Sequence, residues 1–175
     1  MKTLKILLVL AAVILSGFSR DSQRTEAGVV KTMKFDGVII TNPSAGLTEC
    51  TPMGKPYPYI AHSRTGWLQG HQSHGGKLIT EQSTWELSSC NTDFSNMINT
   101  SQIEGRVTVA NGDLYSFICI MEVNIVTNDV KLYVTVTGGE GKFEGVTGQM
   151  MMTGIHTETG IPVSGGGVFN FPKND

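Results

Sequence analysis

The sequence contains few charged residues, and beyond residue 19 it contains few strong helix formers. Charged residues make up 16% of the 175 residues, whereas about 25% is usual in globular domains. Residues 20–175 include only four alanines and six leucines, although both residue types have high helix propensity. These shortages argue against a helical fold. The hydrophobic content of 39% is nonetheless sufficient for the core of one ordinary domain.

The chain also has no run of basic residues. Its formal net charge is −2, and it becomes −4 when the lysines at positions 2 and 5 are left out. Nucleic-acid binding relies on clustered Lys and Arg side chains that neutralise phosphates. We therefore expect no nucleic-acid partner.

Long hydrophobic runs are scarce, and the longest, residues 6–15, spans ten residues. It follows Lys2 and Lys5 and precedes the small residues Gly17 and Ser19, which is the pattern of a secretory signal peptide. A transmembrane helix needs about 20 apolar residues, so no stable membrane span is expected. We predict a cleaved signal peptide over residues 1–19, a flexible segment over 20–28 and a single domain over 29–175. The predicted location is secreted or periplasmic.

Glycine, in contrast, is abundant, with 21 of 175 residues, or about one in eight against a usual 7%. Glycine, asparagine and aspartate separate runs in which apolar and polar residues alternate, which is the period of a β-strand. The predicted strands cover residues 29–41, 59–72, 77–87, 102–109, 114–126, 130–137, 148–157 and 163–171. About eight strands joined by short turns predict an antiparallel meander that forms a barrel or a sandwich.

Alternation within two strands predicts which side chains face the interior. The more apolar set is Tyr115, Phe117, Cys119, Met121 and Val123 in one strand, and Leu132, Val134 and Val136 in the other. Between residues 109 and 114 the pair Asn111-Gly112 predicts a tight hairpin with a type I′ turn, in which both central residues have positive φ.

A glycine-rich stretch carries the most specific motif in the chain. Residues 138–148 read GGEGKFEGVTG, and no helix-forming sequence follows them, which argues against a phosphate-binding loop. We expect the glycines to allow close backbone approach and the single aromatic residue to fill the core beside them. The motif residues are Gly138, Gly139, Gly141, Phe143, Gly145 and Gly148, together with the hairpin residues Asn111 and Gly112.

This motif resembles the late Gly-Gly-x-Gly-x-Phe-x-Gly-x-x-Gly pattern of the allene oxide cyclase barrel-like superfamily, whose shape is related to calycins and dirigent proteins. Residues 109–113 (VANGD) and 73–77 (SHGGK) are similar to elements of bacterial secreted members of that group. The resemblance covers roughly residues 60–171. It implies a single eight-stranded antiparallel β-barrel over 29–175, with an apolar cavity open to a small ligand. The resemblance is also compatible with a homo-oligomer, because related cyclases are oligomeric.

The three cysteines lie in a chain predicted to enter a compartment that permits disulfides. Cys119 lies on the apolar face of a strand and is expected to be a buried thiol. Cys50 and Cys90 are the favoured disulfide pair, and three reduced thiols or another pairing are the alternatives.

No constellation of catalytic or metal-ligating residues stands out. His71 and His74 are two ligands without a nearby carboxylate or thiolate, so no metal site is expected. An inward-facing glutamate would acquire a raised pKa suited to proton transfer, but Glu81, Glu86, Glu104 and Glu122 are interpreted as solvated. Residues 99–101 (NTS) match an N-glycosylation sequon.

These observations favour a non-enzymatic secreted barrel that binds a small apolar molecule or has a structural or interaction role. The rival is a cofactor-independent isomerase or cyclase that acts on an unsaturated lipid-like or polyketide-like substrate in the cavity. No cofactor is expected, and no catalytic or ligand-binding residue is assigned.

Overall fold

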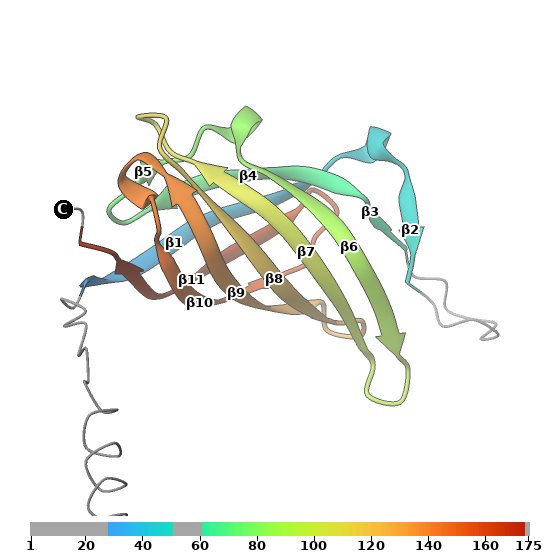
Figure 1. Ribbon diagram of the computed structural model, residues 1–175. Coiled ribbons are helices and arrows are strands. Elements are labelled where there is room, and N and C mark those ends of the chain that lie inside the picture. Colours follow the sequence, from blue (N-terminus) through green and yellow to red (C-terminus); the bar gives the residue numbers. More distant parts are fainter. Residues whose placement is uncertain (1–27, 51–60, 174–175) are drawn as a thin grey trace, which may run out of the picture.

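The computed structural model describes residues 28–50 and 61–173 (Figure 1). Its long strands are β1 (Val29–Thr41), β4 (Thr65–Gln72), β6 (Thr84–Asp93), β7 (Ile98–Thr108), β8 (Leu114–Asn124), β9 (Asp129–Glu140), β10 (Thr147–Ile155) and β11 (Ile161–Phe171). The short elements are β2 (Leu47–Glu49), β3 (Ala61–Ser63), β5 (Gly76–Lys77) and the 3₁₀ helices η1 (Pro43–Ala45), η2 (Thr80–Gln82) and η3 (Gly141–Phe143). The predicted signal peptide, almost all of the segment 20–28, and the proline-containing residues 51–60 lie outside the described residues.

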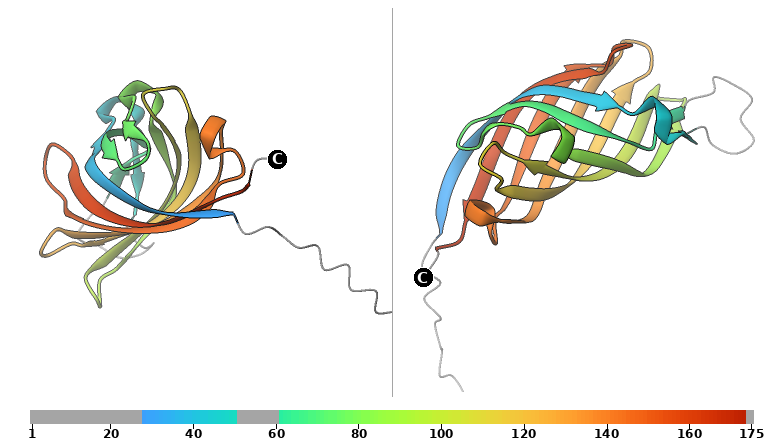
Figure 2. Two further views of the ribbon diagram at one scale, coloured as in Figure 1. Left: turned by 90° about the vertical axis from the view of Figure 1, so that its left-hand side faces the viewer. Right: turned by 90° about the horizontal axis from the view of Figure 1, so that it is seen from above.

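The eight long strands form a closed ring of antiparallel pairings in the order β1-β11-β10-β9-β8-β7-β6-β4, and β4 pairs again with β1. Figure 2 shows the sheet curling round to enclose an interior. The predicted all-β class and the eight-stranded antiparallel barrel are therefore confirmed.

The ring closes through one long strand and one short contact. β1 pairs with β11 over 29–39 and with β4 over 35–41. It therefore joins the two ends of the strand order and closes the ring. β4 and β6, in contrast, pair over only three residues of each strand, 65–67 and 84–86. This β4–β6 contact is the shortest link in the ring.

Glycines and aromatic residues alternate across this short contact on the inner side of the barrel. Gly66 pairs with Trp85, Trp85 pairs with Gly105, and Gly105 pairs with Phe117. A Cβ atom on Gly66 would lie 2.6 Å from the Trp85 ring, and one on Gly105 would lie 2.7 Å from Cζ of Phe117. Each ring thus packs against a glycine backbone, which is the small-and-large alternation that fills narrow barrels.

A second such pair lies in the glycine-rich motif. Gly148 pairs with Phe169, and the Phe169 ring occupies the position that a Cβ of Gly148 would need. Phe143, at the centre of the motif, is fully buried and packs edge-on against Tyr115. The expectation that Phe143 fills the core beside the glycines is confirmed.

The faces predicted from alternation are also confirmed. All eight side chains assigned to the interior on β8 and β9 are buried. Met150 and Met152 face the interior while Met151 is 55% exposed, as alternation along β10 requires.

The predicted strand over 77–87 is wrong in its first half. The chain forms β5 and then η2, and β6 begins only at Thr84. The Ser83 hydroxyl donates to the Thr108 carbonyl oxygen (3.1 Å) and accepts from the Thr108 N–H (3.0 Å). The Ser83 side chain thus bonds the backbone groups of Thr108 that a neighbouring strand would otherwise bond. Serine interrupts regular strand pairing in this way.

Three other predicted strand boundaries need correction. The strand predicted over 59–72 is divided at Arg64 into β3 and β4, and its first two residues lie outside the described residues. β7 begins at Ile98, four residues before the predicted start at Gln102, and β6 extends to Asp93, six residues beyond the predicted end at Leu87. Except for Ile98 and Cys90, the extra residues are polar, so they carry no apolar alternation.

The predicted type I′ turn at Asn111-Gly112 is wrong as well. Gly112 has a φ of 89°, but Asn111 is not among the residues with positive φ. The Gly112 N–H donates to the Val109 carbonyl (2.8 Å), and the Val109 N–H donates to the Asp113 carbonyl (2.9 Å). The loop is thus one residue longer, with a single left-handed glycine at its end, which is the common three-residue hairpin.

Within the described residues, no helix has the length and apolar character that crossing a membrane requires.

Replacing Gly105 by alanine tests the glycine–aromatic packing. The new Cβ would lie 2.4 Å from the Thr84 carbonyl oxygen and 2.7 Å from the Phe117 ring, so we expect destabilisation of about 1–3 kcal/mol from overpacking. Urea unfolding measures the effect, with Ser164→Ala on the exposed face of β11 as the control. A second change, Phe117→Leu, should recover part of the loss. Equal stability of Gly105→Ala and the control would contradict this packing.

Candidate functional site: the barrel interior and its polar end

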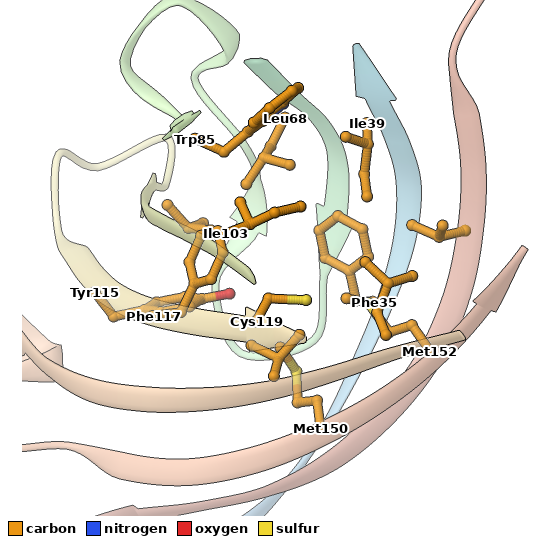
Figure 3. Close-up of a pocket in the computed structure, with 14 residues that line it drawn as sticks. Phe35, Ile39, Leu68, Trp85, Ile103, Tyr115, Phe117, Cys119, Met150 and Met152 are labelled. Atoms are coloured by element: carbon orange, nitrogen blue, oxygen red, sulfur yellow. The ribbon is translucent and has the colours of Figure 1, made fainter. Parts of the chain in front are cut away.

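The barrel encloses an apolar cavity of about 40 Å³ (Figure 3). Figure 3 shows aromatic, aliphatic and sulfur-containing side chains converging on it from opposite walls. Its lining consists of Phe35, Ile39, Leu68, Trp85, Ile103, Val107, Tyr115, Phe117, Cys119, Leu132, Val134, Met150, Met152 and Val163. Among residues 28–50 and 61–173, no charged side chain belongs to this lining.

Two of the lining residues can titrate, but burial keeps both neutral near pH 7. Burial raises the pKa of the Cys119 thiol to about 12, and it raises the pKa of the Tyr115 hydroxyl well above its usual value. Burial in apolar surroundings disfavours the charged form. Cys119 is a free thiol, as expected, but it is a poor nucleophile in this setting because the thiolate is the reactive form.

Tyr115 also carries the main polar contact at the aromatic end of the interior. Its hydroxyl donates to Oε1 of Gln72 (2.8 Å), and Gln72 is almost fully buried. The Tyr115 ring packs edge-on against Phe143 and Phe169. These contacts hold the tyrosine in one orientation, so it forms a fixed wall of the cavity.

The glycine motif supports this aromatic end. Gly141 and Gly145 both have a φ of 63°, a left-handed conformation that suits glycine. A Cβ on Gly139 would lie 2.7 Å from Cβ of Phe143. Gly138 lies opposite Ser116 on the outer face of the barrel, where a Cβ would meet open space. Together these glycines let η3 turn Phe143 inward.

The opposite end of the interior is polar, and sequence reasoning missed it. Thr92, Asn99 and Ser101 are all buried at this end. Ser101 is two residues along β7 from Ile103, which lines the cavity. The continuing alternation 99, 101, 103 was the signal that could have found these residues, but their polarity hid it.

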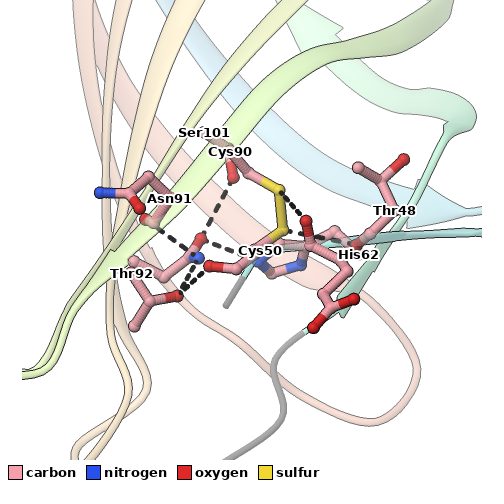
Figure 4. The surroundings of a disulfide bond; sticks show 9 residues. Thr48, Cys50, His62, Cys90, Asn91, Thr92 and Ser101 are labelled. Carbon is pink, nitrogen blue, oxygen red and sulfur yellow. Dashed lines mark hydrogen bonds between the residues drawn. A yellow bond between two sulfur atoms is a disulfide. The ribbon is translucent and has the colours of Figure 1, made fainter. Parts of the chain in front are cut away.

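Asn99 is the centre of a hydrogen-bonded network at this end (Figure 4). Its Nδ2 group donates to Oγ1 of Thr92 (2.9 Å) and to the Asn91 carbonyl (3.3 Å). Its Oδ1 atom accepts from the Ser101 hydroxyl (3.1 Å) and lies 2.8 Å from Nε2 of His62. Because Oδ1 can only accept, Nε2 of His62 carries the proton and donates to it. The sequon residue Asn99 is therefore fully buried with its amide occupied.

His62 lies in a short two-stranded sheet that we call the strap, residues 47–50 and 61–63. Figure 1 shows β2 and β3 beside the barrel end where β6 runs into β7. Burial lowers the pKa of His62 below 6.5, and the nearby His156 lowers it further, while the hydrogen bond to Asn99 opposes both effects. The imidazole is therefore neutral at pH 7.

A disulfide joins the strap to the barrel. It links Cys50 to Cys90 of β6, the pair favoured from the sequence, across 40 positions of the chain. The Thr92 hydroxyl donates to the Cys50 carbonyl (2.8 Å) beside it. A covalent bond and two hydrogen-bonded residues, His62 and Thr92, thus hold the strap in place.

The remaining sequence candidates do not gather at this site. Glu81, Glu86 and Glu104 are exposed, and Glu122 is half-buried on the outer face of β8. His71 and His74 are exposed, and the described residues contain no group of three or more side chains suited to holding a metal ion.

In comparisons with known proteins, no family model matches the chain and no curated protein matches it. The barrel supports the architecture that the allene oxide cyclase resemblance implied, while membership of that family stays a prediction.

Removing the disulfide should loosen the strap and destabilise the protein. Closing a loop of this length contributes about 3 to 4 kcal/mol in the chain-entropy model. We expect urea unfolding of the double variant Cys50→Ala, Cys90→Ala to show an unfolding free energy lower by that amount. Thiol labelling of the unfolded wild type without reductant should modify only Cys119. Labelling of three thiols would contradict the pairing.

The buried His62 should make stability depend on pH. Because its pKa is lower folded than unfolded, the unfolded chain binds more protons below pH 6.5, the ordinary value, and the folded state loses stability as pH falls. The variant His62→Gln can still donate to Asn99 but cannot titrate. We expect the wild type to lose more unfolding free energy than this variant between about pH 7.5 and pH 5. Parallel losses would refute this role of His62.

Proposed function

We propose that this protein is a non-enzymatic barrel that binds a compact apolar molecule in its interior. The observation that carries the proposal is the cavity itself, whose lining, as far as the described part of the chain forms it, is apolar and uncharged. Apolar cavities of this kind stay dry and favour small apolar guests.

The size of the cavity restricts the ligand. A volume of about 40 Å³ is well below the roughly 150 Å³ of an engineered cavity that admits benzene, and further below the 300–1,000 Å³ of drug-sized sites. A guest of few heavy atoms fits this space. Met150 and Met152 line it with flexible thioether chains, which can rearrange to admit a somewhat larger molecule.

The same lining disfavours the rival cyclase or isomerase. General acid–base catalysis needs a group whose pKa lies near the working pH, whereas the Cys119 and Tyr115 pKa values are raised far above neutrality. His62, whose pKa is lowered by burial, does not line the cavity. A lipid-length substrate would also require extensive repacking.

We further propose that the protein acts outside the cytoplasm, either secreted or periplasmic. The Cys50–Cys90 disulfide supports this proposal, because structural disulfides persist in oxidising compartments.

Changing the cavity volume tests the binding proposal. Cys119→Leu should fill the cavity, and Met152→Ala should enlarge it. We expect the wild type to bind xenon, Cys119→Leu to lose this binding, and Met152→Ala to gain affinity for benzene. Xenon-129 chemical shifts and the rise in melting temperature with benzene are the measurements.

Thr153→Leu is the matched control, because Thr153 is exposed on the same strand and should leave xenon binding unchanged. Equal xenon shifts in the wild type and in Cys119→Leu would refute binding in this cavity.

An interaction role is the second candidate, and an exposed apolar stripe on the outer face favours it. The stripe consists of Ile118, Ile120, Tyr133, Met151 and Val168, each at least 36% exposed. One row of pairings runs Ile120, Tyr133, Met151 and then Gly166, which has no side chain. Contiguous exposed apolar surface marks interaction sites.

We infer that a second copy of the chain covers this stripe. A two-fold axis parallel to the strands, between β9 and β10, would set Ile120 over the partner's Gly166 and Tyr133 against the partner's Met151. Sulfur–aromatic contacts of this kind are favourable. Such a self-matching patch is what an isologous dimer requires.

The variant Met151→Glu should convert a dimer to a monomer in sedimentation velocity, because it would bury a charge at the centre of the contact. Val126→Glu, at an exposed valine outside the stripe, is the control and should stay dimeric. A monomeric wild type at the highest soluble concentration would refute this role and leave the cavity proposal untouched.

A further inference from the structure

A shallow groove of about 680 Å³ crosses the outer face of the barrel above the short β4–β6 contact. It lies on the opposite side of the sheet from the cavity, and its volume is in the range of small-ligand sites. Its outward-facing walls come from β4, β6, β7 and β8. Trp85 and Phe117 border both the groove and the cavity, while every other lining residue belongs to only one of the two.

Trp67 lies in the first of two rows of side chains along this groove. Trp67 pairs with Thr84, Thr84 with Arg106, and Arg106 with Ser116. Trp67 is half-buried and faces outward, whereas its neighbour Leu68 faces the core. An indole ring at a wet surface offers an apolar face together with a polar N–H edge.

The second row contains two carboxylates directly opposite each other. Thr65 pairs with Glu86, Glu86 with Glu104, and Glu104 with Ile118. Like charges in this position destabilise a sheet. Neither glutamate forms an ion pair among the described residues, where the ion pair observed joins Lys142 and Asp113. Natural proteins break such local rules mainly at functional sites.

We propose that this groove binds a neutral oligosaccharide. The Trp67 ring would stack on the apolar face of one sugar, the two carboxylates would accept hydrogen bonds from its hydroxyls, and Arg106 would donate to a neighbouring oxygen. The hydroxyls of Thr65, Thr84 and Ser116 can donate or accept. A polyanion is repelled by the two carboxylates, and a simple cation is disfavoured by Arg106 in the same groove.

The first test maps binding to the wild-type protein by NMR. The probes are hexasaccharides of β-1,4-linked glucose and of β-1,4-linked N-acetylglucosamine, with tetramethylammonium chloride as the cationic probe. We expect one hexasaccharide to shift the backbone amides of residues 65–67, 84–86 and 104–106. The absence of such shifts with either sugar at about 10 mM would overturn the proposal, because the dissociation constant would then lie above about 10 mM. Shifts with tetramethylammonium alone would also overturn it.

Variants then assign the roles of the side chains. Trp67→Ala should weaken sugar binding by about tenfold or more, and Glu104→Gln should weaken it severalfold while keeping the side-chain shape. The control is His71→Ala, which removes an exposed ring from the same strand outside the groove. If Trp67→Ala does not fold, Glu104→Gln and Arg106→Gln take its place, and unchanged affinity in both would refute the assignment. Xenon binding in the cavity should be the same in all folded variants.

Discussion

Closing an antiparallel sheet on itself requires strong coiling of the strands, and the packing of aromatic rings over glycines makes that closure compatible with a filled core. The run Gly66, Trp85, Gly105 and Phe117 crosses β4, β6, β7 and β8, where the ring is held by its shortest strand pairing. A side chain in place of either glycine would collide with a ring and with a neighbouring carbonyl oxygen. The aromatic side chain restores the burial that each glycine gives up.

This packing leaves the interior with two chemically different ends. At one end Tyr115, Phe143 and Phe169 form an aromatic cluster supported by the glycine motif. At the other end Asn99 satisfies four hydrogen bonds, and the strap contributes one of its partners, His62. A buried amide is tolerated only when its donors and acceptors are paired. The strap is thus part of the fold, because it completes the network that Asn99 requires.

The strands that could be predicted from the sequence are those whose inward-facing residues are all apolar. β8 and β9 carry apolar residues at successive inward positions, and their interior sets were assigned correctly. The first half of β7 could not be predicted in the same way, because its inward residues Asn99 and Ser101 are polar. The burial of Asn99 depends on hydrogen bonds to Asn91, Thr92 and His62. A local sequence pattern does not predict such hydrogen bonds. Ser83 shows the same limit, since its bond to Thr108 connects residues 25 positions apart.

The abundance of glycine and the shortage of helix formers already determined an all-β chain, and period-two alternation determined most strands and their faces, because both depend on local backbone preference. Only the tertiary structure decided which strand pairs with which, how small the remaining cavity is, and which polar side chains are buried. Those outcomes depend on contacts between residues distant in sequence. The glycines illustrate both levels. Their number predicted turns and corners from the sequence, whereas Gly66, Gly105 and Gly148 are needed because the fold places an aromatic ring against each of them.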